Sequence, residues 1–342
     1  MQKIELICSL SSIQNIGGET IKNDYLYEYL GEKNFDVNLL NFENYRDNKF
    51  ILLLKCIYSI INPFSKKIIL SKASKSAYLY LKLYHYLNIW NKKLYYFVIG
   101  GNFHNFLLDK EFDIKYYKKI SKIYVETYKM RDILIKKLKL TQTDYLPNFK
   151  KFKIKNRSNK KIELPLKIVF FSRIEREKGV DLIFNMLNEI NKSELKIKID
   201  FYGPIKNEYK KIFYGKIKKT KEVKYYGILN IKNNKVYDIL RNYDLMLFPT
   251  YWEGEGFPGV IIDSFIAGVP ILASDWNYNK EIVKEKVGFL FKAKDQKDFE
   301  EKIKNVLTNP NILVEKSKNC FNEAKKYEIN YVLKNVLKEL KT

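Results

Sequence analysis

The sequence predicts an α/β protein made of two doubly wound, Rossmann-like domains that face a cleft. Short apolar runs typical of buried parallel strands alternate with segments of helical periodicity through both halves of the chain. A polar, strongly basic segment without periodicity, residues 149–163, separates the two alternating series and is typical of a domain boundary. With 342 residues, the chain is long enough for two domains that each bury a core.

In the first predicted domain, residues 1–150, we expect strands at residues 3–8, 36–40, 94–99 and 122–126. Between the first two strands, apolar side chains recur at helical spacing and predict an amphipathic helix whose buried face carries Ile21, Tyr25, Leu26, Tyr29 and Leu30.

In the second predicted domain, residues 164–325, we expect strands at residues 167–171, 196–202, 223–226, 244–248 and 270–273. The helix after the first of these strands places Val180, Ile183, Met186, Leu187 and Ile190 on one face. A last helix, from about residue 330 to 340, carries one apolar stripe formed by Leu333, Val336, Leu337 and Leu340.

The most informative segment is residues 253–270, where an apolar strand leads through a glycine-rich loop into a short helix. Pro258 suits the first position of that helix. The unpaired N–H groups at a helix N-terminus favour an anion such as a diphosphate. Glu255 precedes the helix and Asp263 lies about two turns into it, a spacing that suits several hydroxyls of one ligand.

This segment resembles the donor-site signature of family 4 glycosyltransferases of the GT-B fold. That signature has two glutamates separated by seven residues, followed by small residues and Gly-x-Pro. Here the first acid is Glu255, the second is Asp263 in place of glutamate, and Gly268 and Pro270 complete the pattern. The resemblance implies that residues 326–342 form a C-terminal helix that packs back on the N-terminal domain.

A second motif, residues 170–181, has two cations on either side of a charged loop that leads from a strand into a helix. Arg173 and Lys178 suit a diphosphate at the helix N-terminus. The alternative is a solvated loop in which Glu175 and Glu177 pair with these cations. The segment resembles the family's Arg-x4-Lys-Gly pattern, which implies that both cations bind the donor diphosphate.

The resemblance also implies roles for other positions. Glu255 would hold hydroxyls of the donor sugar, and Asp263 the ribose. Further donor-binding positions are Gly17, Gly18, Gly203, Gly227, Phe257, Pro258, Gly259, Val260 and Glu281, and the acceptor-side positions are Gly100, Gly101 and Asn102. His104 completes the predicted catalytic set of Glu255, Arg173 and Lys178. Its imidazole can hydrogen-bond sugar hydroxyls or assist the acceptor proton, or it can simply cap a backbone group.

The implied activity is a retaining transfer of a sugar from a nucleotide-sugar to a hydroxyl of a glycan or lipid-linked glycan acceptor. The expected context is bacterial surface polysaccharide, such as capsule, O-antigen or exopolysaccharide. The resemblance implies a same-face displacement in which the leaving phosphate accepts the acceptor proton. No Asp-x-Asp sequence occurs, so we expect no metal and no cofactor, with Arg173 and Lys178 in their place.

The formal charge of +24 has two interpretations. The lysines either form an ordinary solvated surface or attract anionic membrane lipid or a lipid-linked diphosphate. Residues 66–93 combine basic, aromatic and apolar side chains, which fits an interfacial helix or a core helix with a basic outer face. Arginine is scarce and no nucleic-acid-binding motif occurs, so we expect no nucleic-acid partner.

The three cysteines are widely spaced and indicate a reducing compartment. The first residues lead directly into a strand without a secretory signal pattern, and no apolar run is long enough to cross a bilayer. We therefore expect a cytoplasmic protein, with peripheral attachment to the inner membrane face as an option.

Two other classes of function remain open. A dehydrogenase or another Rossmann-type nucleotide-dependent enzyme fits the fold, although the first turn lacks Gly-x-Gly-x-x-Gly and the acid about twenty residues later. A basic, non-catalytic protein that binds membranes or polyanions fits the charge.

Overall fold

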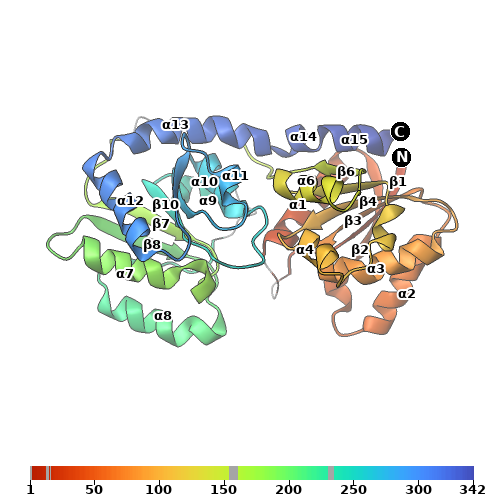
Figure 1. The fold of residues 1–342 in the computed structure, drawn as a ribbon, viewed down its shortest axis with the longest axis horizontal. Coiled ribbons are helices and arrows are strands. Elements are labelled where there is room, and N and C mark those ends of the chain that lie inside the picture. The colour runs from red at the N-terminus through yellow and green to blue at the C-terminus, as the bar shows by residue number, and fades with distance from the viewer. Residues whose placement is uncertain (1, 13–14, 16, 154–160, 230–234) are drawn as a thin grey trace. The chain divides into compact units, whose positions relative to one another are not determined.

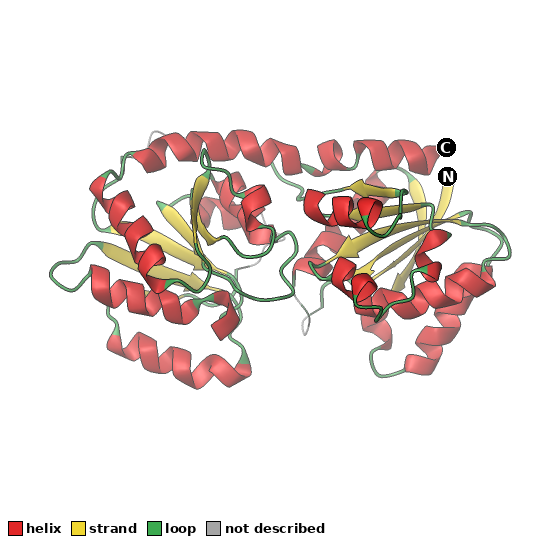
Figure 2. Ribbon diagram, viewed as in Figure 1, coloured by secondary structure: helices red, strands yellow, loops and turns green. Residues whose placement is uncertain are grey.

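The computed structural model describes residues 2–12, 15, 17–153, 161–229 and 235–342. The chain forms two compact units, each built around a six-stranded sheet (Figures 1 and 2). Unit 1 comprises Met1–Lys151, Gly254–Phe257 and Ile329–Thr342, and unit 2 comprises Phe152–Glu253 and Pro258–Glu328.

The sheet of unit 1 is parallel and has the strand order β2-β1-β3-β4-β5-β6. Its strands are β1 (Gln2–Cys8), β2 (Phe35–Asn41), β3 (Lys67–Ala73), β4 (Lys93–Ile99), β5 (Lys122–Val125) and β6 (Thr143–Tyr145). Its helices are α1 (Gly18–Glu32), η1 (Phe42–Tyr45), α2 (Lys49–Ile61), α3 (Ser74–Leu87), α4 (Phe103–Leu108), α5 (Lys115–Lys118), α6 (Tyr128–Lys136), α14 (Ile329–Val332) and α15 (Lys334–Lys341).

The sheet of unit 2 is also parallel, with the order β12-β11-β10-β7-β8-β9. Its strands are β7 (Leu166–Phe171), β8 (Ile197–Tyr202), β9 (Val223–Tyr225), β10 (Leu245–Phe248), β11 (Ile271–Ser274) and β12 (Gly288–Phe291). Its helices are η2 (Arg176–Lys178), α7 (Val180–Ile190), α8 (Asn207–Lys219), α9 (Lys235–Leu240), α10 (Gly259–Ala267), α11 (Asn279–Ile282), α12 (Gln296–Thr308), α13 (Ile312–Ala324) and η3 (Lys325–Tyr327).

These strand orders define a switch point in each sheet. In unit 1 the order reverses between β1 and β3, and in unit 2 between β7 and β10. Ligands of open α/β sheets bind outside the carboxyl ends of the strands at such a point. The predicted class, two Rossmann-like α/β domains, is confirmed by the two sheets.

The prediction missed three strands, β3, β6 and β12. Strand β3 carries Lys67 and Lys72, and its apolar pattern is therefore short. Both lysines are buried, and each finds a partner far away in the sequence: Lys67 Nζ donates to the Leu340 carbonyl at 2.7 Å, and Lys72 Nζ pairs with Glu19 at 2.7 Å. Strands β6 and β12 have only three and four residues and so leave a weak period; β6 also contains an aspartate and β12 begins at a glycine, and both residue types are disfavoured in strands.

Residues 66–93 are therefore not one basic helix. After β3, helix α3 turns Ala77, Tyr80, Leu81 and Tyr84 into the core. Its opposite side is exposed and mixes lysine with apolar side chains. Helix α3 is therefore a core helix, as one of the two interpretations of this segment predicted, but its outer face is apolar as well as basic.

The last residues of the chain pack on unit 1. Ile329, Leu333, Val336 and Leu340 are buried in a hydrophobic cluster with side chains of β1 and α1. Hydrogen bonds fix the segment at both ends: the Ile329 N–H donates to the Lys150 carbonyl at 3.0 Å, and Tyr124 donates to the Glu339 carboxylate at 2.9 Å. Among the described residues, no helix has the length and apolar character needed to cross a membrane.

Candidate functional site

The loop after β7 carries the two predicted diphosphate-binding cations, Arg173 and Lys178. The chain leaves β7 at Phe171, makes the short helix η2, and turns into α7 at Gly179. Gly179 has φ +74°, and a Cβ there would lie 2.2 Å from the Pro249 carbonyl oxygen. Only glycine therefore allows the β7 loop to approach the end of β10 this closely. This close approach lies at the switch point of unit 2.

Both cations gather over one side chain of the β10 loop, Trp252. The Arg173 guanidinium carbon lies 5.0 Å from the indole centre, and Lys178 Nζ lies 4.6 Å from it, within range of cation–π attraction. The Trp252 carbonyl accepts a hydrogen bond from Trp276 Nε1 at 2.8 Å, which helps to fix the loop. Trp252 lies one residue before the signature segment and was not among the predicted site residues.

The predicted alternative, pairing with neighbouring glutamates, is present for Arg173. One of its guanidinium nitrogens lies 3.5 Å from the buried carboxylate of Glu175, which Lys206 also approaches at 3.6 Å. Glu177 instead accepts the Tyr251 N–H at its backbone carbonyl, at 2.8 Å. The Arg173 side chain remains 47% exposed, so this pairing leaves it accessible to a ligand.

Gly203 and Gly227 lie together beyond β8 and β9, because the Gly203 N–H donates to the Gly227 carbonyl at 2.8 Å. Gly203 has φ +140°, and a Cβ there would lie 1.9 Å from the Ser172 carbonyl oxygen. The Gly203 loop is therefore packed directly against the residue that precedes Arg173. This contact connects two of the predicted donor-binding loops.

Helix α10 begins at Gly259, with Pro258 at its N-cap, one residue later than predicted. Val260 lies in the first turn and is partly exposed. Asp263, in the second turn, is 2% exposed and accepts a hydrogen bond from the Tyr237 hydroxyl at 3.0 Å. Glu281 is half-buried in α11, where its N–H donates to the Tyr278 carbonyl at 2.8 Å.

In unit 1, the segment Gly254–Phe257 lies against the turn after β4. The Gly101 N–H donates to the Gly254 carbonyl at 3.4 Å, and a Cβ on Gly256 would lie 2.9 Å from the carbonyl carbon of Gly100. Glycine at position 256 is therefore required by close backbone approach. Glu255, which is 7% exposed, is thereby brought next to the predicted acceptor-side residues.

Two further residues complete this part of unit 1. Asn148 Nδ2 donates to the Phe257 carbonyl at 3.0 Å and holds the other end of the segment. Asn102 is the N-cap residue of α4. Asn148 follows a three-residue strand with no recognisable motif, so no sequence signal pointed to it.

The Gly17–Gly18 turn lies at the switch point of unit 1, at the start of α1. A Cβ on either glycine would meet no atom within 4 Å, so open space surrounds both residues. Ion pairs made by two buried lysines support the first turns of α1: Lys72 with Glu19, and Lys22 with Glu126, each at 2.7 Å. Ile16, which precedes the turn, lies outside the described residues.

His104 lies in the first turn of α4 and is 8% exposed. Burial, and then the positive charge of Lys129, lower the pKa of its imidazole from the usual value of 6.5. The neutral imidazole is therefore favoured near pH 7, as a group that accepts a proton must be.

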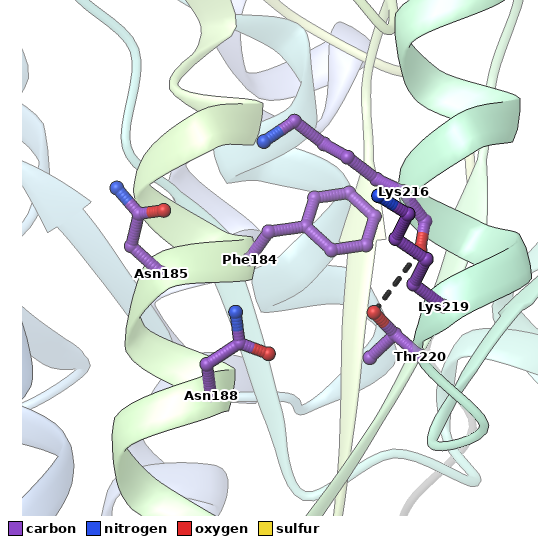
Figure 3. A pocket seen from close by; sticks show the side chains of 6 residues that line it. All are labelled: Phe184, Asn185, Asn188, Lys216, Lys219 and Thr220. Carbon is purple, nitrogen blue, oxygen red and sulfur yellow. Dashed lines mark hydrogen bonds between the residues drawn. The ribbon is translucent and has the colours of Figure 1, made fainter.

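No group of three or more His, Cys, Asp or Glu side chains within the described ranges could hold a metal ion. A hollow of about 390 Å³ occurs on unit 2 between α7 and α8 (Figure 3). Its lining residues are Phe184, Asn185, Asn188, Lys216, Lys219 and Thr220, and the Thr220 hydroxyl donates to the Lys216 carbonyl at 3.0 Å. It contains none of the predicted site residues.

Comparison with known proteins identifies the family. The family model described as "Glycosyl transferases group 1" matches residues 151–327, more than half of the chain. The chain therefore belongs to this family and is a glycosyltransferase.

One curated relative is the N,N'-diacetylbacillosaminyl-diphospho-undecaprenol alpha-1,3-N-acetylgalactosaminyltransferase of Campylobacter jejuni. It is 29% identical over 104 residues, a match that spans 30% of this chain and 27% of the relative.

Similar solved structures extend over nearly the whole chain. The sucrose-phosphate synthase of Thermosynechococcus elongatus has a TM-score of 0.75 at 13% identity and covers 100% of this chain and 98% of its own. Anabaena HepE in complex with UDP and glucose has a TM-score of 0.73 at 14% identity and covers 100% of both. The lipopolysaccharide outer core galactosyltransferase WaaB has a TM-score of 0.68 at 14% identity and covers 98% of both. These likenesses establish the GT-B fold.

Proposed function

We propose that this chain transfers a sugar from a nucleotide-sugar to a hydroxyl of a glycan or lipid-linked glycan, with retention of anomeric configuration. The observation that carries the proposal is the pair Arg173 and Lys178, gathered over Trp252 at the switch point of a unit that matches a glycosyltransferase family. Two cations at that edge suit a diphosphate, and they stabilise the charge that develops on it as it leaves.

The other roles follow from the same hypothesis. Glu255 holds hydroxyls of the donor sugar, Asp263 the ribose, and neutral His104 is available to a sugar hydroxyl. The leaving phosphate takes the acceptor proton, and no metal ion or cofactor is needed because Arg173 and Lys178 carry the charge.

The names of the relatives support the choice of ligands. HepE was solved with UDP and glucose, which favours a nucleotide-sugar donor here. The curated relative's name includes a diphospho-undecaprenol-linked sugar, and WaaB acts on a lipopolysaccharide outer core. We therefore propose a role in bacterial surface polysaccharide synthesis, at the inner face of the cytoplasmic membrane.

A thermal-shift screen tests the donor site. The purified protein is heated with UDP, GDP, CDP, their common sugar conjugates and NAD. A ligand at a hundred times its Kd adds about 2.7 kcal/mol to the free energy of unfolding. Arg173→Ala should abolish the nucleotide shift, whereas Arg176→Ala, at a nearby exposed cation, should keep it.

The sugar-dependent part of the shift should be lost in Glu255→Gln and kept in Glu253→Gln, which removes an exposed charge two residues earlier. The nucleotide-sugar found in this way then serves in a transfer assay, where NMR of the product reports the anomeric configuration and EDTA tests the need for a metal. No shift with any nucleotide, or a shift with NAD alone, contradicts the proposed donor site.

A further inference from the structure

The outer surface of helices α2 and α3 in unit 1 is apolar and basic at once. Helix α2 exposes Phe50, Leu54, Tyr58 and Ile61, with fractional exposures of 69%, 49%, 54% and 39%. Their spacing of four, four and three residues places them along one side of the helix. A helix that turns such a stripe toward water, in addition to its buried side, leaves apolar area that a partner can cover.

Helix α3 contacts α2 and has an exposed side of similar character. Its exposed side chains include Lys75, Leu79, Lys82 and Tyr86, again at helical spacing. Leu79 is 59% exposed and Tyr86 is 63% exposed. We call the exposed side chains of these two helices the α2–α3 face; both helices lie on unit 1 in Figure 1.

The loop after α3 ties the two helices together. Trp90 is 55% exposed, and its Nε1 donates to the carbonyl of Ile61, the last residue of α2, at 2.7 Å. Ile89, next to it, is 69% exposed. An aromatic ring held at the edge of an apolar surface, with its polar atom satisfied, is typical of membrane interfaces.

The charge of this region differs from that of the chain as a whole. Residues 48–93 contain nine lysines and no aspartate or glutamate, although the chain has 39 acidic residues. Six of these lysines are exposed: Lys49, Lys55, Lys66, Lys75, Lys82 and Lys93. If the lysines only reflected the lysine-rich composition of the chain, aspartate and glutamate would lie between them, as they do in the rest of the sequence. Asp113, whose N–H donates to the Tyr78 hydroxyl of α3, is itself paired with Lys115 at 2.9 Å.

We propose that the α2–α3 face docks on an anionic lipid bilayer. Long lysine stems reach the headgroups while the apolar side chains between them enter the interface, and each lysine near an anionic surface adds attraction. A second copy of this chain fits the face poorly, because a two-fold contact would bring lysines of one sign together. This inference names the surface that would carry the membrane location proposed above, and it does not depend on the transfer reaction, since docking needs neither donor nor acceptor.

Vesicle co-sedimentation tests the inference. The protein should bind vesicles that contain phosphatidylglycerol and should not bind vesicles of phosphatidylcholine alone, and binding should weaken as salt is raised. Lys75→Glu/Lys82→Glu should weaken binding about twenty-fivefold or more, since each lysine near an anionic surface contributes about fivefold. Lys210→Glu/Lys218→Glu, the same charge change on exposed positions of α8, is the matched control and should bind nearly as the wild type.

A second pair of variants tests the apolar contribution. Leu54→Ser/Leu79→Ser should weaken binding several-fold, whereas Leu195→Ser/Ile212→Ser, at apolar positions of unit 2 that are 45% and 41% exposed, should not. All four positions are exposed, so folding should be unaffected, and circular dichroism of each variant checks this.

Fluorescence then identifies the docking face directly. Trp252→Phe/Trp276→Phe leaves Trp90 as the only tryptophan. Its emission should shift to the blue with anionic vesicles, and brominated lipid should quench it. Equal loss of binding in the α2–α3 and control variants, an unchanged Trp90 spectrum, or binding to heparin without binding to vesicles would each overturn the proposal. If the protein does not bind vesicles, the thermal shifts with nucleotides are unaffected, so failure of the docking proposal can be distinguished from failure of the proposed function.

Discussion

Removing the indole of Trp252 should weaken nucleotide binding about fivefold to thirtyfold. The ring lies 5.0 Å from the Arg173 guanidinium and 4.6 Å from Lys178 Nζ. Trp252 and Arg173 are partly exposed and Lys178 is buried, so each cation–π contact contributes at least about 0.5–1 kcal/mol, and ordering a long side chain during binding costs a similar amount. The ring therefore holds both cations in place before the ligand binds. Without it, ordering the two cations makes the binding free energy about 1–2 kcal/mol less favourable.

Isothermal titration with the nucleotide from the thermal-shift screen measures this effect. Trp252→Ala should show the full loss, and Trp252→Phe, which keeps an aromatic face, an intermediate one. Trp90→Ala removes a surface tryptophan of unit 1 and should bind the nucleotide as the wild type does. If Trp252→Ala binds as tightly as the wild type while Arg173→Ala loses binding, the indole does not position the cations and the reasoning is wrong.

Three other predictions follow from the same loops. Gly179→Ala should lower the free energy of unfolding, measured by urea titration, by about 2–5 kcal/mol, because residue 179 has φ +74° and the new Cβ would meet a backbone oxygen. Gly215→Ala, in α8 with open space around the residue, should raise the free energy of unfolding by about 0.5–1 kcal/mol. His104 should titrate below pH 6.5 by NMR. Because the pKa of His104 is lower in the folded state than in the unfolded state, its neutral form stabilises the fold above pH 6.5. This stabilisation is lost as the pH falls through the unfolded-state pKa and then the folded-state pKa. An NMR midpoint above 6.5 would contradict the predicted direction of the shift. Asp263→Glu should destabilise by about 1–3 kcal/mol, and adding Tyr237→Phe should recover part of that loss; no loss in the single variant would show that the pocket has spare room.

The fold class was predictable because it rests on local patterns that repeat. Alternating apolar strands and amphipathic helices leave a clear period in the sequence, and nine of the twelve strands found in the described part of the chain follow from it. Strand β3 could not be found in this way. Its buried Lys67 and Lys72 contradict a buried strand until their distant partners, Leu340 and Glu19, are known.

In the candidate site, too, residues that share one loop were predictable from the sequence, and a residue from a distant loop was not. Arg173, Lys178 and Gly179 lie within one turn of chain, so their pattern survives in the sequence and the structure gives the reason for the glycine. Trp252 is more than seventy residues away, and only the pairing of β7 with β10 brings it under the cations. A motif reports what one loop contains, and the sheet order decides which loops meet.

Asp263 is the one acid that departs from the family signature. By sequence it is a shortened acid, and its effect on the site cannot be judged from the missing methylene alone. In the structure it is 2% exposed, and its carboxylate accepts the hydroxyl of Tyr237, which is equally buried. Because buried polar groups need partners, aspartate and tyrosine form one unit here, and a glutamate would need the space that the phenol fills. The departure is therefore matched by its surroundings, and the proposed contact with ribose must be compatible with this hydrogen bond.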